Sequence, residues 1–95
     1  MKFLESYDFT KEEISSFTKN VPTSVVDLIK EQKKQVKSNL DYLKELGIVN
    51  YKDVFKNFYE MFLIDDSNFR EIFEKYDRDD LIDKIAKNIN IVEYL

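Results

Sequence analysis

A pattern that starts helices recurs along the chain, and it constrains the fold more than any other feature. An apolar residue precedes a capping side chain, a short polar residue follows three positions later, and a second apolar residue comes next. The pattern occurs at 9–14, 49–54, 64–69 and 76–81. In the first instance, the side chain of Thr10 can accept from the amide of Glu13, and Glu13 can reach back to the amide of Thr10. These starts predict an all-α fold.

The spacing of apolar residues and a single glycine set the predicted helix lengths. A further helix must begin between Pro22 and Ser24, and its apolar residues then recur at intervals of three, four or seven until Gly47 ends it. No run alternates as a strand does. After a short turn near 2–7, the predicted helices are 11–19, 24–46, 51–63, 67–76 and 78–94. We expect a single domain, 1–95, in which about five helices form a compact bundle of helix pairs or a short helical repeat.

The composition argues against several kinds of chemistry. The chain has no His, no Cys and one Gly, so it lacks an imidazole base, a thiolate and a glycine-rich phosphate loop. The longest apolar run is Met61–Ile64, whereas a membrane span needs about 20 residues. No secretory signal is visible at the start. We therefore expect a cytoplasmic, non-catalytic protein with no metal, no cofactor and no membrane partner.

Acidic residues are concentrated in one segment. Residues 65–83 contain eight acids and three bases, and they include Glu74, Asp77, Asp79, Asp80 and Asp83. The spacing does not fit a calcium-binding loop, which needs Gly at position 6 and Glu at position 12. Two interpretations remain: the acids cap and solvate a helix start, or they form an acidic docking face for a basic partner.

Lysines flank the apolar stripe of the long predicted helix. Lys30, Lys33, Lys34, Lys37 and Lys44 fall within an arc of about 100° when 100° is allotted per residue. Such an arc can bind phosphates, although the chain has only two Arg residues for bidentate contacts. The arc is interpreted as a solvated flank, as a nucleic-acid surface or as a strip that docks an acidic protein.

The aromatic residues divide into two groups. The phenylalanines at 55, 58, 62, 69 and 73 recur at three- and four-residue spacings and are predicted to form the core between helices 51–63 and 67–76. Tyrosines beside apolar residues often anchor interfaces, and Tyr51, Tyr59 and Tyr94 are the candidates here.

The C-terminal segment carries more apolar residues than one buried face can hold. Ile85, Ile89 and Val92 share one face of the predicted helix, whereas Ile91, Tyr94 and Leu95 lie largely off it. The surplus indicates a contact with a partner protein or with a second copy of the chain, making a homo-oligomer through this helix. The alternative is packing onto the N-terminal turn.

Two stretches resemble the helical repeats of the mitochondrial transcription termination factor family. Residues 7–14 followed by Val21-Pro22 are similar to that family's opening helix and its proline, and residues 39–48 resemble its leucine-rich helix ending at a Gly plus an apolar residue. The resemblance covers the chain from about residue 3 to about residue 63. It implies an architecture of stacked helix pairs, and in that family a basic concave face binds nucleic acid.

The sequence as a whole favours a small acidic protein-binding or regulatory module. Such a module suits a phage or mobile-element inhibitor that docks on a protein partner. The candidate contact residues are Glu74, Asp77, Asp79, Asp80, Asp83, Tyr59, Tyr94 and Leu95. The alternative function is a nucleic-acid-binding helical repeat that uses the lysine arc.

Overall fold

The chain folds entirely into helices. A computed structural model describes all of residues 1–95, with no strand among them. Six α-helices and three 3₁₀ helices follow one another as η1 (Lys2–Tyr7), α1 (Lys11–Asn20), α2 (Thr23–Glu31), α3 (Lys33–Leu46), α4 (Tyr51–Asn57), η2 (Tyr59–Leu63), α5 (Asp66–Glu74), α6 (Arg78–Lys87) and η3 (Ile89–Tyr94). The all-α prediction is confirmed. The expected number of about five helices is wrong, because each of the three longest predicted helices is divided in two.

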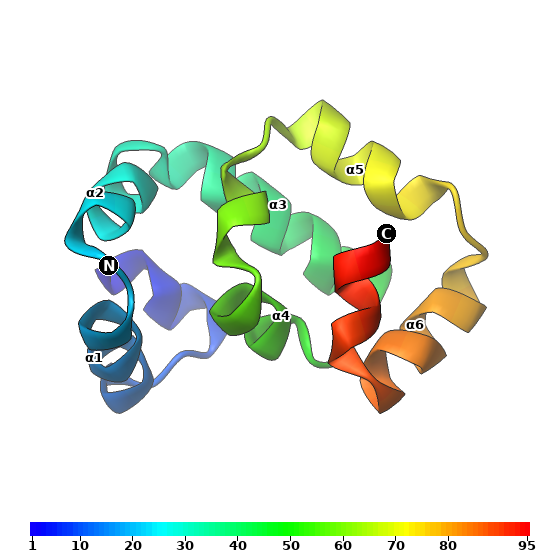
Figure 1. Ribbon diagram of the computed structural model, residues 1–95, viewed down its shortest axis with the longest axis horizontal. Coiled ribbons are helices and arrows are strands. Elements are labelled where there is room, and N and C mark those ends of the chain that lie inside the picture. Colours follow the sequence, from blue (N-terminus) through cyan, green and yellow to red (C-terminus); the bar gives the residue numbers. More distant parts are fainter.

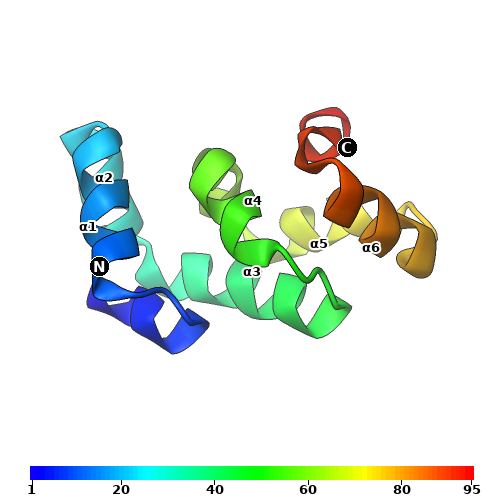
Figure 2. The same cartoon turned by 90° about the horizontal axis from the view of Figure 1, so that it is seen from below.

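The predicted helix 24–46 bends at Gln32. A straight helix of that length would measure about 35 Å, and the longest dimension of the whole molecule is 35 Å. Gln32 leaves helical geometry with φ −100° and ψ 29°, so α2 and α3 run in different directions. The bend places α2 at the same end of the molecule as α1 (Figures 1 and 2).

The other two breaks divide segments that are apolar on more than one side. Helix 51–63 is interrupted at Phe58, and helix 78–94 at Asn88. A straight helix has only one face toward the core, so it could not bury both sets of apolar residues. After the breaks, Phe62 and Val92 are buried in the core, and other apolar residues of η2 and η3 are left half-buried at the surface.

Three of the predicted caps form as expected and one does not. Thr10 and Glu13 make the reciprocal capping box, and Asp65 and Asp77 accept from the amides three residues later. Asn50 makes no cap; its side-chain amide group donates to the carbonyl oxygen of Ile85 at 3.1 Å, and its side-chain oxygen is buried without a partner. A tertiary contact has replaced the local one.

The ends of helices also follow local chemistry. Gly47 ends α3 with φ +100°, in the left-handed region that glycine adopts without strain. A Cβ at this position would lie 3.1 Å from Cδ1 of Ile82 on α6. The glycine therefore stops α3 and also allows α6 to approach.

One continuous core runs through the molecule, and every helical element contributes to it. A chain of aromatic rings links Phe9, Phe55, Phe62, Phe69 and Phe73, with successive centroids 5.8, 5.1, 5.1 and 5.1 Å apart. The predicted aromatic core between residues 51–63 and 67–76 is thus confirmed for four of its five members. The exception, Phe58, is half-buried at the surface.

The helices are arranged around α3. In Figure 2, α3 lies along one side of the molecule, and three ridges rise from it: α1 with α2, then α4 with η2, and finally η3 with α6. The C-terminal η3 packs on α6 and α4. Of the surplus apolar residues of the C-terminal segment, Ile91 and Leu95 are half-buried, whereas Tyr94 is exposed. No helix has both the length and the apolar character needed to cross a membrane.

Candidate protein-binding surface

Two grooves lie on either side of η2. The first, of about 580 Å³, runs between α1 and the α4–η2 ridge, and the second, of about 390 Å³, runs between η2 and η3 with α5 beneath. Asn57 and Tyr59 line both grooves. The two grooves therefore make one surface that passes over η2.

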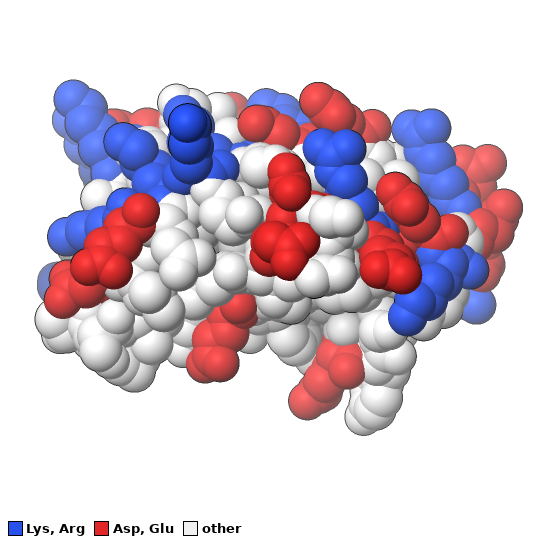
Figure 3. Space-filling view, turned by 90° about the horizontal axis from the view of Figure 1, so that it is seen from above, with Lys and Arg blue, Asp and Glu red and all other residues white.

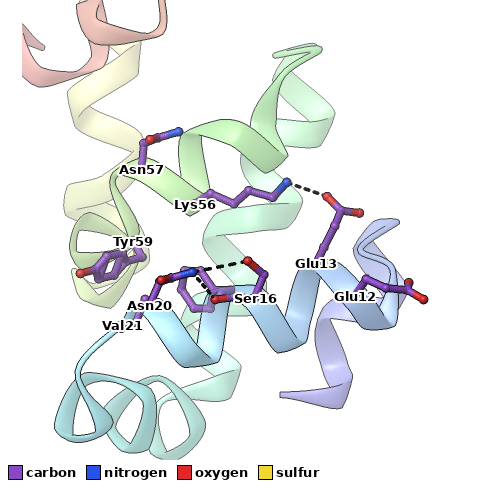
Figure 4. A pocket seen from close by; sticks show the side chains of 9 residues that line it. Glu12, Glu13, Ser16, Asn20, Val21, Lys56, Asn57 and Tyr59 are labelled. Carbon is purple, nitrogen blue, oxygen red and sulfur yellow. Dashed lines mark hydrogen bonds and ion pairs between the residues drawn. The ribbon is translucent and has the colours of Figure 1, made fainter.

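The first groove is mostly polar and is crossed by an ionic contact. Lys56 of α4 donates to Glu13 of α1 at 2.6 Å, and Lys52 donates to the other carboxylate oxygen at 3.0 Å. Figure 4 shows Lys56 and Glu13 pointing toward each other across this groove. The hydrogen bonds from Lys56, from the amide of Thr10 and from Lys52 lower the pKa of Glu13 to about 2. These groups hold α1 against α4, which gives Glu13 a structural role.

The second groove, which we call the η2–η3 groove, is mostly apolar. Six of its nine lining residues are hydrophobic. These six are Phe58, Tyr59, Met61, Ile72, Val92 and Leu95. Its charged residues are Glu60 and Glu93, both of which are exposed and make no ion pair. An open apolar groove of this kind favours contact with another apolar surface.

The structure brings together part of the predicted aromatic and C-terminal set. Tyr59 lies on the ridge between the two grooves, where its ring packs edge-on against Phe17 with centroids 5.5 Å apart. Leu95 lines the η2–η3 groove. Its neighbour Tyr94 is 82% exposed. Two of these three candidates therefore line the same groove, and the third lies next to it in the sequence.

Tyr51 is not an interface anchor, contrary to the prediction. It is buried, and its hydroxyl donates to the carbonyl oxygen of Tyr7 at 2.9 Å and contacts the carboxylate of Asp8 at 3.0 Å. Burial, together with the Asp8 carboxylate, raises the pKa of Tyr51 to about 12. Its amphipathic ring anchors α4 to the N-terminal turn inside the molecule.

The predicted acidic residues lie away from both grooves, on α6 and at the end of α5. Asp77 caps α6. Asp80 and Asp83 pair with Lys84 and Lys87, one turn further along the same helix, at 2.9 Å in each case. The remaining two, Glu74 and Asp79, are exposed and form no ion pair. Most of this acidic set therefore makes contacts within α6.

The predicted lysine arc is divided by the bend at Gln32. Lys30 lies on α2, whereas the other four lysines lie on α3. Lys30, Lys33 and Lys34 are exposed, and Lys37 is half-buried; none of these four is in an ion pair. The fifth, Lys44, lies 3.7 Å from the carboxylate of Asp8. Four of the five lysines thus remain available to a ligand.

Sequence reasoning missed most of the groove. Phe58 was predicted to be core, and the list of contact residues included neither Met61, Ile72 and Val92 nor the acidic pair Glu60 and Glu93. A signal was present in the apolar surplus of residues 58–64 and 89–95. What the sequence could not indicate was that two helix breaks would place these segments on opposite sides of one groove.

No three acidic side chains converge to form a site that could hold a metal ion.

No family model, no curated protein and no solved structure matches this chain. The resemblance to mitochondrial transcription termination factors remains a prediction from the sequence.

Proposed function

We propose that the chain is a non-catalytic protein-binding module that docks on a partner through the surface over η2. The observation that carries this proposal is the η2–η3 groove, in which six hydrophobic side chains surround an open depression. Aromatic and Met residues are enriched at protein interfaces, and Phe58, Tyr59 and Met61 supply them here. A module of this kind acts by occupying its partner, as an inhibitor or regulator does, including those encoded by phages and mobile elements.

The groove is a better-supported docking site than the acidic segment. Asp77, Asp80 and Asp83 already have intramolecular partners. An exposed charge contributes little binding energy beside a buried apolar or aromatic anchor. Of the five acids predicted as contacts in this segment, Glu74 and Asp79 are free to assist a basic partner at a distance.

A capture experiment with matched variants tests the proposal. The tagged full-length chain is incubated with lysate of the source cell or its host, with nuclease present, and bound proteins are identified by mass spectrometry. The groove variant is Met61→Asp. The control is Leu28→Asp, because Leu28 is also a partly exposed apolar residue but lines neither groove. Circular dichroism establishes that both variants fold.

We expect one discrete protein to be retained by the native chain and by Leu28→Asp, and to be lost with Met61→Asp. Loss of one groove anchor typically costs about 2 kcal/mol or more of binding free energy. A partner that Met61→Asp retains, and that is lost when Asp79 and Asp83 are replaced with Lys, would overturn the groove in favour of the acidic segment.

Nucleic-acid binding is the second candidate, and one observation favours it. Lys30, Lys33, Lys34 and Lys37 lie near the α2–α3 bend and form no ion pair. Phosphate binding by such lysines weakens steeply as salt rises, whereas apolar docking hardly responds. Material that is retained only without nuclease, and that is lost when Lys33, Lys34 and Lys37 are replaced with Glu, would place this candidate first.

A further inference from the structure

The charged residues of the η2–η3 groove have only one sign. Glu60 projects from η2 on one side and Glu93 from η3 on the other, and no Lys or Arg lines the groove. Both carboxylates are exposed and make no ion pair within the chain. A ligand in the groove therefore meets an apolar floor between two unpaired negative charges.

The charge of the rest of the molecule reinforces this local pattern. Residues 38–95 contain 13 acids and 8 bases, a net charge of −5, whereas residues 1–37 contain 6 acids and 7 bases, a net charge of +1. In the face of the molecule drawn in Figure 3, uncharged and acidic side chains lie along the lower edge, and basic and acidic side chains are mixed above it. The half of the chain that forms the groove thus attracts a basic partner and repels an acidic one.

A second copy of the chain is a poor occupant. Packing groove against groove in a symmetric dimer would bring the four carboxylates of two Glu60 and two Glu93 residues to one interface. Like charges at an interface are unfavourable. The occupant must supply positive charge as well as apolar side chains.

The secondary structure of the occupant follows from the backbone around the groove. An extended peptide gains affinity by adding to an exposed sheet edge, and this chain has no strand. A helix satisfies its own backbone hydrogen bonds and needs only side-chain contacts. An amphipathic helix can therefore bind in the groove without leaving its peptide groups unpaired.

We infer that the η2–η3 groove receives an amphipathic helix of a partner protein, with its apolar stripe against Met61, Ile72 and Leu95 and with Lys or Arg residues beside Glu60 and Glu93. This inference rests on the proposed docking function and names the chemistry of the partner. The two carboxylates select the partner by charge, and the apolar lining holds it.

The inference is tested with two synthetic peptides of one helical pattern. Both peptides carry Leu at helical spacing. In one peptide all the remaining positions are Lys, and in the other they are Glu. Fluorescence anisotropy measures their affinity for the full chain. The test variant is Glu60→Lys with Glu93→Lys. The matched control is Glu31→Lys with Glu45→Lys, which changes the net charge equally at exposed positions in the last turns of α2 and α3, outside the groove.

We expect the Leu/Lys peptide to bind about tenfold more tightly than the Leu/Glu peptide, since two exposed ion pairs contribute about that factor. The groove variant should reverse this preference, whereas the control should retain it. Nuclear magnetic resonance of the native chain should show that the Leu/Lys peptide perturbs the amides of Met61, Ile72 and Leu95.

Three results would overturn the inference. They are equal affinity for both peptides, equal effects of the groove and control variants, and perturbations confined to α6. A chain that loses its captured protein with Met61→Asp but binds neither peptide would refute the helical basic partner while leaving the docking function intact. A concentration-dependent increase in mass, abolished by Met61→Asp, would instead assign the groove to a second copy.

Discussion

Residues 36–43 and residues 85–92 share a sequence pattern, yet they fold differently. In both, an apolar residue is followed three positions later by Asn and then directly by another apolar residue. The first segment is part of the uninterrupted helix α3, whereas the second breaks at Asn88 between α6 and η3. In the first, Asn39 is fully buried and donates to the carbonyl oxygens of Phe62 and Ile64, at 2.9 Å each.

The difference lies in what surrounds each asparagine. An Asn side chain competes with the helix for backbone groups unless it has another partner. Asn39 has two such partners in η2 and just beyond it. Asn88 is exposed, and its side chain accepts from the amide of Asn90 at 3.1 Å, which caps η3. Without a tertiary partner, the same residue ends the helix instead of anchoring it.

Acidic residues show the same contrast between contacts with distant elements and contacts within one helix. Glu13 reaches from α1 to two lysines of α4, about 40 positions away in the sequence. Asp80 and Asp83 pair only with lysines one turn away on their own helix. The carboxylate of Glu13 thus connects two elements, whereas the paired carboxylates of α6 remain local. The side chain that links α6 to α3 is basic, since Arg78 donates to the carbonyl oxygen of Leu46 at 2.9 Å.

The largest expected effect comes from removing the buried asparagine. Asn39→Ala would leave the carbonyl groups of Phe62 and Ile64 without their donor, and an unsatisfied buried polar group costs about 1–3 kcal/mol. We expect the free energy of unfolding in urea to fall by about 3 kcal/mol. Because η2 is attached through this contact, the variant should also bind its partner less well. A loss below about 1 kcal/mol would show that the contact does not anchor η2.

An intermediate effect is expected from the ionic contact between α1 and α4. The pKa of Glu13 is about 2 in the folded chain, below its unfolded value of about 4.3. Its contribution is therefore complete above pH of about 4.3 and is lost as the pH falls toward 2. At neutral pH, Glu13→Gln should cost about 1 kcal/mol, since the pair is partly exposed.

Urea unfolding at a series of pH values measures the effect of Glu13. The native chain should lose stability between about pH 4.3 and pH 2, and Glu13→Gln should reduce that loss. Asp80→Asn is the matched control for an acid that pairs only within its helix. If Glu13→Gln and Asp80→Asn change the acid profile equally, the proposed contrast between these two acids is wrong.

The smallest effect is expected at the exposed asparagine. Asn88→Ala removes a cap at the surface, which costs about 0.5–1 kcal/mol, and alanine favours continuation of α6. Stability should therefore change little, whereas circular dichroism should show unchanged or greater helicity. If α6 extends through this position, η3 moves and the η2–η3 groove loses affinity for the Leu/Lys peptide. Unchanged affinity would mean that the core contacts of Val92 alone position η3.

Much of the helical content was predictable because its signals are local. Thr10, Asp65 and Asp77 bond to amides three residues away, and Gly47 adopts its conformation without help from distant residues. The candidate site was only partly predictable. Tyr59 and Leu95 were identified from their apolar neighbours, but their place on one groove depends on breaks that no nearby residue specifies.

The sequence by itself determined the all-α class, three helix starts, the end of α3 and the aromatic core. The tertiary structure alone decided where long helices break, which asparagine is buried and which apolar residues face the groove. The physical reason is the distance along the chain between interacting groups. A cap and its amide are three residues apart, whereas Asn39 meets its carbonyl partners 23 and 25 residues away, and only the folded chain brings them together.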